Sequence, residues 1–180
     1  MNDEQRRAIE AVWRLESAPI VARLVRIVRD VDLAEQVAQD AFVAALEQWP
    51  RDGVPANPGA WLMAAAKHRA IDAVRRDRVV QQKNDELTRR AAAAQAAAGP
   101  LEAPDLGDDV LRLMFLCCHP VLPPESRTAL TLRLLAGLTT DEIARAYLVP
   151  EPTIAQRIVR AKRTLAEAKV PYEEIGRAHV

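Results

Sequence analysis

The stretch from Leu138 to Leu165, LTTDEIARAYLVPEPTIAQRIVRAKRTL, decides the fold because its pattern predicts two helices joined by a short turn. Thr139 and Glu142 have the spacing of a capping box, which predicts the start of the first helix. Pro150 and Pro152 lie where the second helix must begin. The first amides of a helix have no partner within it, so proline is tolerated there. The two prolines therefore set the helix start and stiffen the turn.

The same stretch predicts how the two helices pack. Ile143 and Tyr147 face inward, small Ala144 allows a close crossing, and Val149 fills the turn. Apolar residues at helical spacing give the second helix a single buried stripe. This stripe comprises Ile154, Ile158, Ala161 and Leu165.

The opposite face of the second helix is polar and basic, given about 100° of rotation per residue. Such side chains can donate hydrogen bonds to base edges and phosphates in a major groove. The pattern favours a DNA-binding helix-turn-helix, and the alternative is an ordinary amphipathic helix with a solvated basic face. The face comprises Thr153, Gln156, Arg160 and Arg163, flanked by Arg157 and Lys162.

Composition points to helices, whereas net charge says nothing of nucleic acid. The 180 residues are 49% hydrophobic but only 4% aromatic, which favours helices packed through small and aliphatic side chains. Basic and acidic residues balance at 25 each, yet residues 154–165 hold four basic residues and no acid. Residues 67–78 hold five basic residues against two acids. Two local basic patches are therefore expected in a neutral protein.

The sequence also lacks targeting signals. Its start, MNDEQRRAIEAVW, does not have the basic-then-apolar order of a signal peptide, and no apolar run approaches the length of a membrane span. The cysteines, Cys117 and Cys118, are adjacent, which disfavours a mutual structural disulfide. We therefore expect a cytoplasmic protein with no membrane partner.

Two helices are expected before the first loop. Residues 3–29 predict a helical stretch broken near Pro19. Asp32 is a suitable N-cap for the next helix, and Glu35 completes a capping-box spacing. Trp49 and Pro50, followed by the loop RDGVPANP, are expected to end that helix.

A third helix is expected from Asn57, which caps it, and Pro58, which occupies its first position. After Arg78 the sequence becomes polar, then alanine-rich, then broken by Gly and Pro, which predicts a linker that is partly helical. The expected fold class is all-α, with two small helical domains joined by a linker. The expected divisions are a first domain at 1–78, a linker at 79–104, a second domain at 105–169 and a tail at 170–180.

Three segments, in order, resemble a known family. The segment DLAEQVAQDAFVAALEQW resembles the second conserved region of bacterial extracytoplasmic-function (ECF) sigma factors, and TIAQRIVRAKRTL resembles their fourth region. The segment WLMAAAKHRAIDAVRR resembles the same family's Trp-Leu…Asn-x-x-x-Asp…Arg-Arg helix, with His68 where the family usually has Asn. The resemblance covers residues 5–168. The matching residues are Asp32, Ala34, Glu35, Gln39, Asp40 and Phe42, then Trp61, Leu62, Asp72, Arg75 and Arg76.

The resemblance implies partners and site residues. The fold it implies is a region 2-like domain and a region 4-like helix-turn-helix domain that bind core RNA polymerase and promoter DNA. Residues implied to contact the clamp helices of the polymerase β′ subunit are Glu35, Gln36, Gln39 and Asp40. Residues implied at the −10 element are Trp61, Lys67, His68, Arg75 and Arg76. Residues implied at the −35 element are Thr153, Gln156, Arg157, Arg160, Lys162 and Arg163.

The C-terminal part resembles one subgroup of that family, through FLCCHPVLPPESRTALTLRLLAGLT and EIARAYLVPEPTIAQRIVRAK. Members of the subgroup usually carry a long helical extension, which is missing here. The final EIGRAHV matches the translation of a common sequencing adapter, so we expect the tail to be artefactual or truncated. An anti-sigma factor and the missing extension are further partners that the resemblance allows.

Other chemistry is not indicated. Cys117, Cys118 and His119 lack the spacing of zinc ligands, and buried structural thiols are the better interpretation. The sequence has no Gly-rich phosphate loop, nucleophile elbow or catalytic carboxylate pair, so we expect no enzyme and no cofactor. Two other classes remain open at this point: an independent helix-turn-helix regulator that binds operator DNA, usually as a dimer, and a helical adaptor that binds no DNA.

Overall fold

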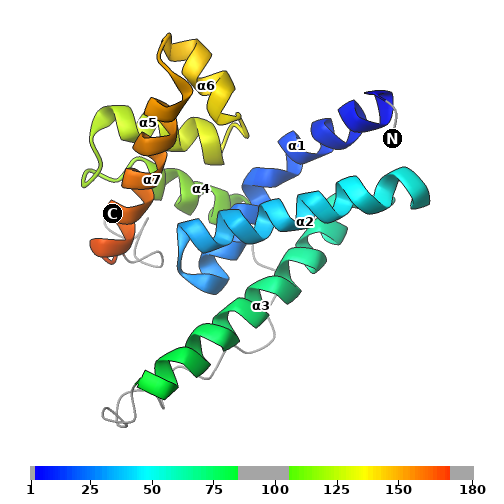
Figure 1. Ribbon diagram of the computed structural model, residues 1–180, viewed down its shortest axis with the longest axis horizontal. Coiled ribbons are helices and arrows are strands. Elements are labelled where there is room, and N and C mark those ends of the chain that lie inside the picture. The colour runs from blue at the N-terminus through cyan, green and yellow to red at the C-terminus, as the bar shows by residue number, and fades with distance from the viewer. Residues whose placement is uncertain (1–2, 85–105, 171–180) are drawn as a thin grey trace.

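The computed structural model describes residues 3–84 and 106–170, and within them every regular element is an α-helix (Figure 1). This confirms the predicted all-α fold class. The helices are α1 (Asp3–Val28), α2 (Val31–Asp52), α3 (Pro58–Asn84), α4 (Leu106–Cys117), α5 (Pro124–Leu134), α6 (Thr140–Tyr147) and α7 (Glu151–Glu167).

Helix α1 is not broken near Pro19, as the sequence had suggested; it continues through this residue. A proline inside a helix removes one hydrogen bond, to the carbonyl four residues earlier. That carbonyl belongs to Leu15, and because Leu15 is 77% exposed, water can donate a hydrogen bond to the carbonyl instead. Burial of Ile20 and Leu24 just beyond the proline keeps the rest of the helix in place.

Helix α2 begins two residues earlier than predicted. Its N-cap is Asp30, whose Oδ1 accepts a hydrogen bond from the backbone N–H of Leu33 at 2.8 Å. Asp32 is therefore in the first turn and, with Glu35, does not form the predicted capping box. The helix also continues past Pro50 to Asp52, so the predicted end at Trp49–Pro50 is wrong. Its end is set by Gly53, with φ of +83° and its N–H bonded to the carbonyl of Trp49.

Helix α3 begins as predicted. Oδ1 of Asn57 accepts a hydrogen bond from the N–H of Ala60 at 3.0 Å, and Pro58 is the first helical residue. The helix continues to Asn84, so the first six residues of the predicted 79–104 linker are helical. The rest of that linker, and the tail from 171 onward, lie outside the described residues.

The core of the N-terminal half is built around alanine. Small side chains let α1, α2 and α3 approach closely, and larger residues such as Leu24 and Leu62 fill the remaining space. The C-terminal half packs α5, α6 and α7 around Leu130, Ile143 and Ile154. The fully buried alanines of the first core are Ala22, Ala34, Ala38, Ala41, Ala45, Ala66 and Ala70.

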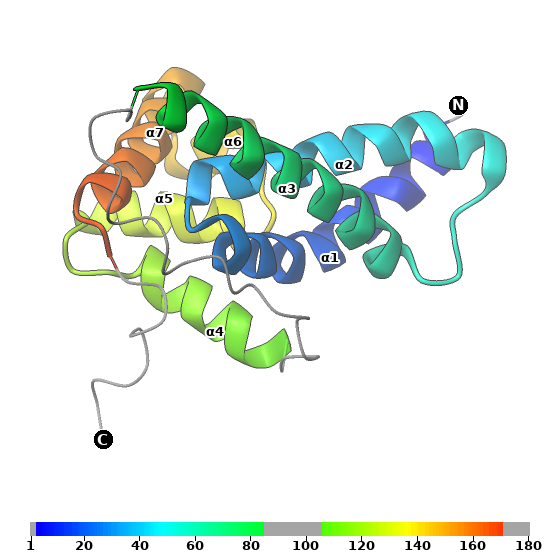
Figure 2. The ribbon, with the colours of Figure 1, turned by 90° about the horizontal axis from the view of Figure 1, so that it is seen from below.

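Helix α4 connects the two halves. It lies along α1 and packs against it more extensively than against α5 (Figure 2). Its Asp109 carboxylate is buried between Arg26 of α1 and Arg112 of α4, at 3.6 Å and 3.7 Å. The buried apolar residues of both halves form one continuous cluster. The two predicted domains therefore pack on each other through α1 and α4.

The position of the α2 cap can be tested by substitution. Asp30→Ala removes the acceptor for the first free amides and should lower the free energy of unfolding by about 1 kcal/mol. Asp32→Ala is the comparison, because Asp32 caps nothing and its exposed carboxylate makes only an ion pair with Lys162; its loss should cost less than about 0.5 kcal/mol. Urea unfolding followed by circular dichroism measures both. Equal losses, or a larger loss for Asp32→Ala, would restore the capping role to Asp32.

Candidate nucleic-acid interface

The helix-turn-helix starts with a complete capping box, as predicted. The N–H of Glu142 donates to Oγ1 of Thr139 at 3.1 Å, and the N–H of Thr139 donates to Oε2 of Glu142 at 2.8 Å. The backbone hydrogen bond from Thr139 holds the pKa of the Glu142 carboxyl below its ordinary value. Glu142 also accepts a hydrogen bond from Nη2 of Arg14 at 2.6 Å, which ties α6 to α1.

The turn between α6 and α7 keeps the prolines outside the helix interior. Pro150 is the N-cap of α7 and Pro152 lies in its first turn, so neither interrupts the helix. Ala144 is buried where α6 and α7 cross, in agreement with the sequence. Tyr147 does not face inward as predicted, because it is 37% exposed. The chain reverses one residue later at Leu148, in the left-handed conformation, and this directs the end of α6 toward solvent.

Helix α7 presents the two faces that its sequence predicts. Its apolar stripe is buried throughout, which confirms the predicted packing. On the opposite side Gln156, Arg160 and Arg163 are exposed, and Thr153 is half-buried. Arg163 donates to Oε1 of Glu167 at 2.6 Å, one turn further along the helix. The stripe comprises Ile154, Ile158, Ala161 and Leu165.

Two other basic residues of α7 contact acids. Arg157 lies 3.6 Å from Glu125 of α5. Lys162 points away from the exposed face and toward α2, where its side chain is only 12% exposed. The structure therefore separates Lys162 from the surface formed by Gln156, Arg160 and Arg163.

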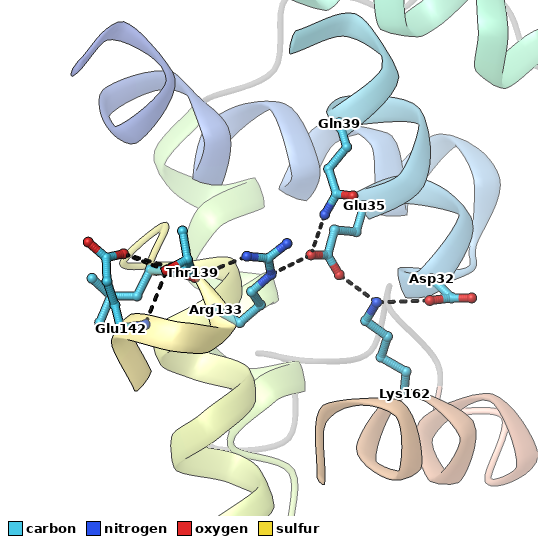
Figure 3. A network of polar contacts seen from close by, with 8 residues as sticks. Asp32, Glu35, Gln39, Arg133, Thr139, Glu142 and Lys162 are labelled. Carbon is cyan, nitrogen blue, oxygen red and sulfur yellow. Dashed lines mark hydrogen bonds and ion pairs between the residues drawn. The ribbon is translucent and has the colours of Figure 1, made fainter. Parts of the chain in front are cut away.

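Lys162 joins a network of charges between the two halves of the chain (Figure 3). Its Nζ lies 2.8 Å from Oδ1 of Asp32 and 2.5 Å from Oε2 of Glu35. Oε1 of Glu35 accepts hydrogen bonds from Nε of Arg133 at 2.7 Å and from Nε2 of Gln39 at 2.8 Å. Burial alone would lower the pKa of Lys162, but Glu35 and Asp32 outweigh it and raise that pKa.

This network divides the residues implied to contact polymerase. Gln36 and Asp40 are exposed on α2, and Gln36 borders the groove between α2 and helices α5 and α7. Glu35 is buried and Gln39 half-buried, because both turn toward α5 and α7. We call these four residues, together with Asp32, the acidic face of α2.

The residues implied at the −10 element lie on α3. Trp61 is half-buried and packs edge-on against Trp49, with ring centroids 5.4 Å apart. Lys67 and His68 are exposed one to two turns further along. Positions 75 and 76 belong to the same helix, and their side chains lie outside the described part of the structure.

A groove of about 660 Å³ opens between α1 and the start of α3. Lys67 and Arg23 supply basic groups to its wall, and Asn57 lies where the loop enters α3. Glu16 of α1 reaches the backbone at Gly59, in the first turn of α3, where any side chain would collide with the Glu16 carboxylate. The groove thus combines basic side chains with a loop end.

Two functional groups, Arg133 and Asp109, escaped the sequence argument. Glu35 was given a capping role and an implied polymerase contact, but its burial between α2, α5 and α7 was not foreseen. Asp109 shares its helical face with buried Leu113 and Leu116, so an acid on an apolar stripe was a signal of a buried ion pair. Burial raises the pKa of the Asp109 carboxyl, and Arg26, Arg112 and Arg23 only partly offset this.

The cysteines differ from each other. Cys117 is fully buried, and burial raises its pKa to about 12, so it stays a thiol at neutral pH. Cys118 is exposed, so the interpretation of both thiols as buried is wrong for this one. Within residues 3–84 and 106–170, no group of three or more His, Cys, Asp or Glu side chains could hold a metal ion. No helix in the same described ranges is long and apolar enough to cross a membrane.

Both halves of the chain match models of one protein family. Residues 14–79 match Sigma-70 region 2, and residues 112–165 match Sigma-70, region 4. The two matches fall on the helices that carry the α3 groove and the helix-turn-helix. The chain belongs to the sigma-70 family, and within it to the ECF sigma factors.

Curated relatives agree with this family. An uncharacterised protein of Rhizobium meliloti is 41% identical over 83% of this chain, and the chain spans about a third (36%) of that relative's length. The ECF RNA polymerase sigma factor SigC of Mycobacterium tuberculosis is 28% identical over 94% of this chain and 88% of its own length. The RNA polymerase sigma-H factor of Pseudomonas aeruginosa is 29% identical over 84% of this chain and 81% of its own.

The inward position of Lys162 predicts a stability effect. Lys162→Ala leaves a buried Glu35 oxygen without its cation and should lower the free energy of unfolding by roughly 1–3 kcal/mol. Arg160→Ala, two residues away on the exposed face, should change it by less than about 0.5 kcal/mol. Urea unfolding of both variants measures the difference. Equal small effects would mean that Lys162 is solvated and the inter-helix network contributes nothing.

Proposed function

We propose that this chain binds core RNA polymerase and directs promoter recognition and transcription initiation. The observation that carries the proposal is the combination of two sigma-70 regions in family order with an exposed donor face on the second helix of a helix-turn-helix. A simple operator-binding regulator would not need the region 2 match, and nothing observed favours that alternative. The proposal is for a cytoplasmic initiation factor that is not an enzyme.

Recognition of the −35 element is assigned to the exposed face of α7. The N-terminal end of a recognition helix usually supplies the base contacts. Thr153 lies in the first turn of α7 and exposed Gln156 in the second; exposed Arg160 lies at the middle of the helix, on the same face, and these side chains can donate to base edges. Arg163, one turn further, suits a phosphate contact, and Arg157 could exchange Glu125 for one. Lys162 can join them only if it leaves its partners on α2.

Recognition and opening at the −10 element are assigned to α3 and the loop before it. Exposed Lys67 and His68 lie on a helix that begins at a groove lined by Lys67 and Arg23 together with Glu16 and apolar residues. The two cations suit a nucleic-acid backbone, and the apolar lining suits an unstacked base. Trp61 supports the helix at that point through its contact with Trp49. Arg75 and Arg76, further along α3, are proposed as phosphate contacts on the strength of the family motif.

Docking on the β′ clamp helices of core polymerase is assigned to α2. Gln36 and Asp40 are exposed on adjacent turns and offer polar and acidic groups to a partner. Glu35 and Gln39 belong to the same surface but face the C-terminal half in the free chain. An anti-sigma factor and a C-terminal extension remain further predicted partners.

The proposal is tested by transcription itself. The full chain should co-purify with core RNA polymerase and should support run-off transcription from promoters that core enzyme alone does not use. An operator-binding regulator would bind DNA without polymerase and would not replace a sigma factor. A helical adaptor would give neither transcript nor specific DNA binding.

The docking face can be tested at one exposed residue. Asp40→Arg should weaken binding of the full chain to core polymerase at least tenfold, because it reverses the charge at the proposed contact. Helicity and unfolding should be unchanged, since Asp40 is exposed. The matched control is Asp52→Arg at the C-terminal end of α2, an exposed acid outside the acidic face of α2. Unchanged affinity of the Asp40 variant would move the docking surface elsewhere.

The α7 face predicts different roles for two arginines. Arg160→Ala should cost roughly 1–3 kcal/mol on the preferred −35 sequence and relax the choice at one base pair. Arg163→Ala should weaken all sequences similarly and reduce the salt slope by about one. Holoenzyme affinities for matched and scrambled −35 elements across a salt series separate these effects. If both variants change only the salt slope, α7 is a non-specific basic clamp.

A further inference from the structure

An apolar side chain lies on the exposed donor face of α7. Val159 is 64% exposed, although valine is among the residues that are most often buried in proteins. It follows Gln156 by three residues and precedes Arg163 by four, the spacings that place side chains next to each other on one face of a helix. The face that is proposed to meet the −35 element is therefore polar and basic around an exposed valine.

Folding of the free chain gives no reason for a valine at this position. The buried stripe of α7 consists of other residues, and the covered part of Val159 only borders the open groove between α2 and helices α5 and α7. A β-branched residue is also a weaker helix former than alanine. A valine that neither belongs to the core nor strengthens the helix suits a contact with a group outside the free chain.

The chemistry of the major groove limits what that contact can be. Base edges there present hydrogen-bond donors and acceptors, and the apolar group among them is the C5-methyl of thymine. Gln156 and Arg160 can pair with the acceptors and donors, whereas a valine gains free energy by removing apolar surface from water. On a base edge, the thymine methyl is the group that a valine can cover.

A second apolar residue of the helix-turn-helix is still more exposed but lies elsewhere. Leu148 is 93% exposed and is in the turn before α7, in the left-handed conformation with φ of +53°. It is therefore not part of the exposed face of α7. Leu148 provides a matched control, because it is an exposed apolar side chain of the same motif outside the donor face.

We propose that Val159 recognises a thymine of the −35 element by van der Waals contact with its C5-methyl group. The proposal rests on the proposed function and adds a specificity-determining residue to it. Val159 lies three residues beyond Gln156, or about 4.5 Å along the helix axis, and successive base pairs are about 3.4 Å apart. The thymine should therefore lie within about two base pairs of the pair that Gln156 contacts.

Replacement of thymine by uracil tests the proposal, because it removes the methyl group and keeps the hydrogen-bonding groups of the base pair. The protein is the holoenzyme of the full chain with core RNA polymerase of Rhizobium meliloti. The DNA is a duplex whose −35 element this holoenzyme has selected from a randomised pool. Gln156→Ala identifies the base pair that Gln156 contacts, as the position at which this variant relaxes the choice of base.

Each thymine of the selected element, on either strand, is replaced in turn, and holoenzyme affinity is measured by fluorescence anisotropy. Replacement at one position near the Gln156 contact should weaken binding about fourfold. This is the change expected when a methyl group that contributes about 0.8 kcal/mol is no longer buried.

Val159→Ala shows whether the valine is the group that contacts the methyl. This variant should bind the thymine-containing element about fourfold more weakly than the unsubstituted chain and should not respond to uracil at the same position. Two independent effects would add, so a missing uracil response measures a direct coupling of side chain and methyl. Leu148→Ala should keep the full uracil response. Urea unfolding of the Val159 variant should match that of the unsubstituted chain, because the side chain is exposed.

Three results would overturn the proposal. In the first, no thymine near the Gln156 contact responds to uracil. In the second, the uracil response persists in Val159→Ala. In the third, Val159→Ala loses affinity for core polymerase and not for DNA, which would assign the valine to a protein contact. If the unsubstituted chain forms no holoenzyme or selects no −35 sequence, the proposed function itself fails, and the role of Val159 fails with it.

Discussion

The burial of Glu35 is the constraint on which the arrangement of this molecule depends. A buried carboxylate requires cationic or hydrogen-bonding partners, and losing one is costly. The cations that pair with Glu35 are distant in sequence. Arg133 is 98 residues away, and Lys162 is further still. Asp109 of α4 meets the same requirement through Arg26 of α1. Two buried acids, one on each half of the chain, thus link the halves beside the continuous apolar cluster.

The sequence correctly predicted those features of the helices that depend on interactions between residues close together in the chain. The capping box of Thr139 and Glu142 and the buried stripe of α7 depend on neighbours within a few residues, so spacing alone revealed them. The start of α2 was mistaken because Asp30 and Asp32 both have plausible cap spacing; Asp30 makes the cap, whereas Asp32 pairs with Lys162, 130 residues away. Long-range ion pairs of this kind leave no periodic signal, although an acid on an apolar stripe is a hint.

The same division between local and long-range interactions applies to the functional surfaces. The exposed donors of α7 and the loop-entry groove at α3 are properties of single helices and their neighbours, and the family motifs fall on them. The relation between the two surfaces is a tertiary property that no motif encodes. Alanine-rich packing joins the helices of the N-terminal half, whereas ion pairs beside an open groove join α2 to α7.

The most direct test of this account measures the distance between the halves in solution. Donor and acceptor dyes at Ala11→Cys on α1 and Ala146→Cys on α6, both exposed and both close along their helices to the Arg14–Glu142 ion pair, report it by single-molecule energy transfer in a Cys118→Ser background. The account predicts one short-distance population, and a shift to longer distances when Arg133→Ala and Lys162→Ala together remove both cations of Glu35. An unchanged distance in that double variant would contradict it.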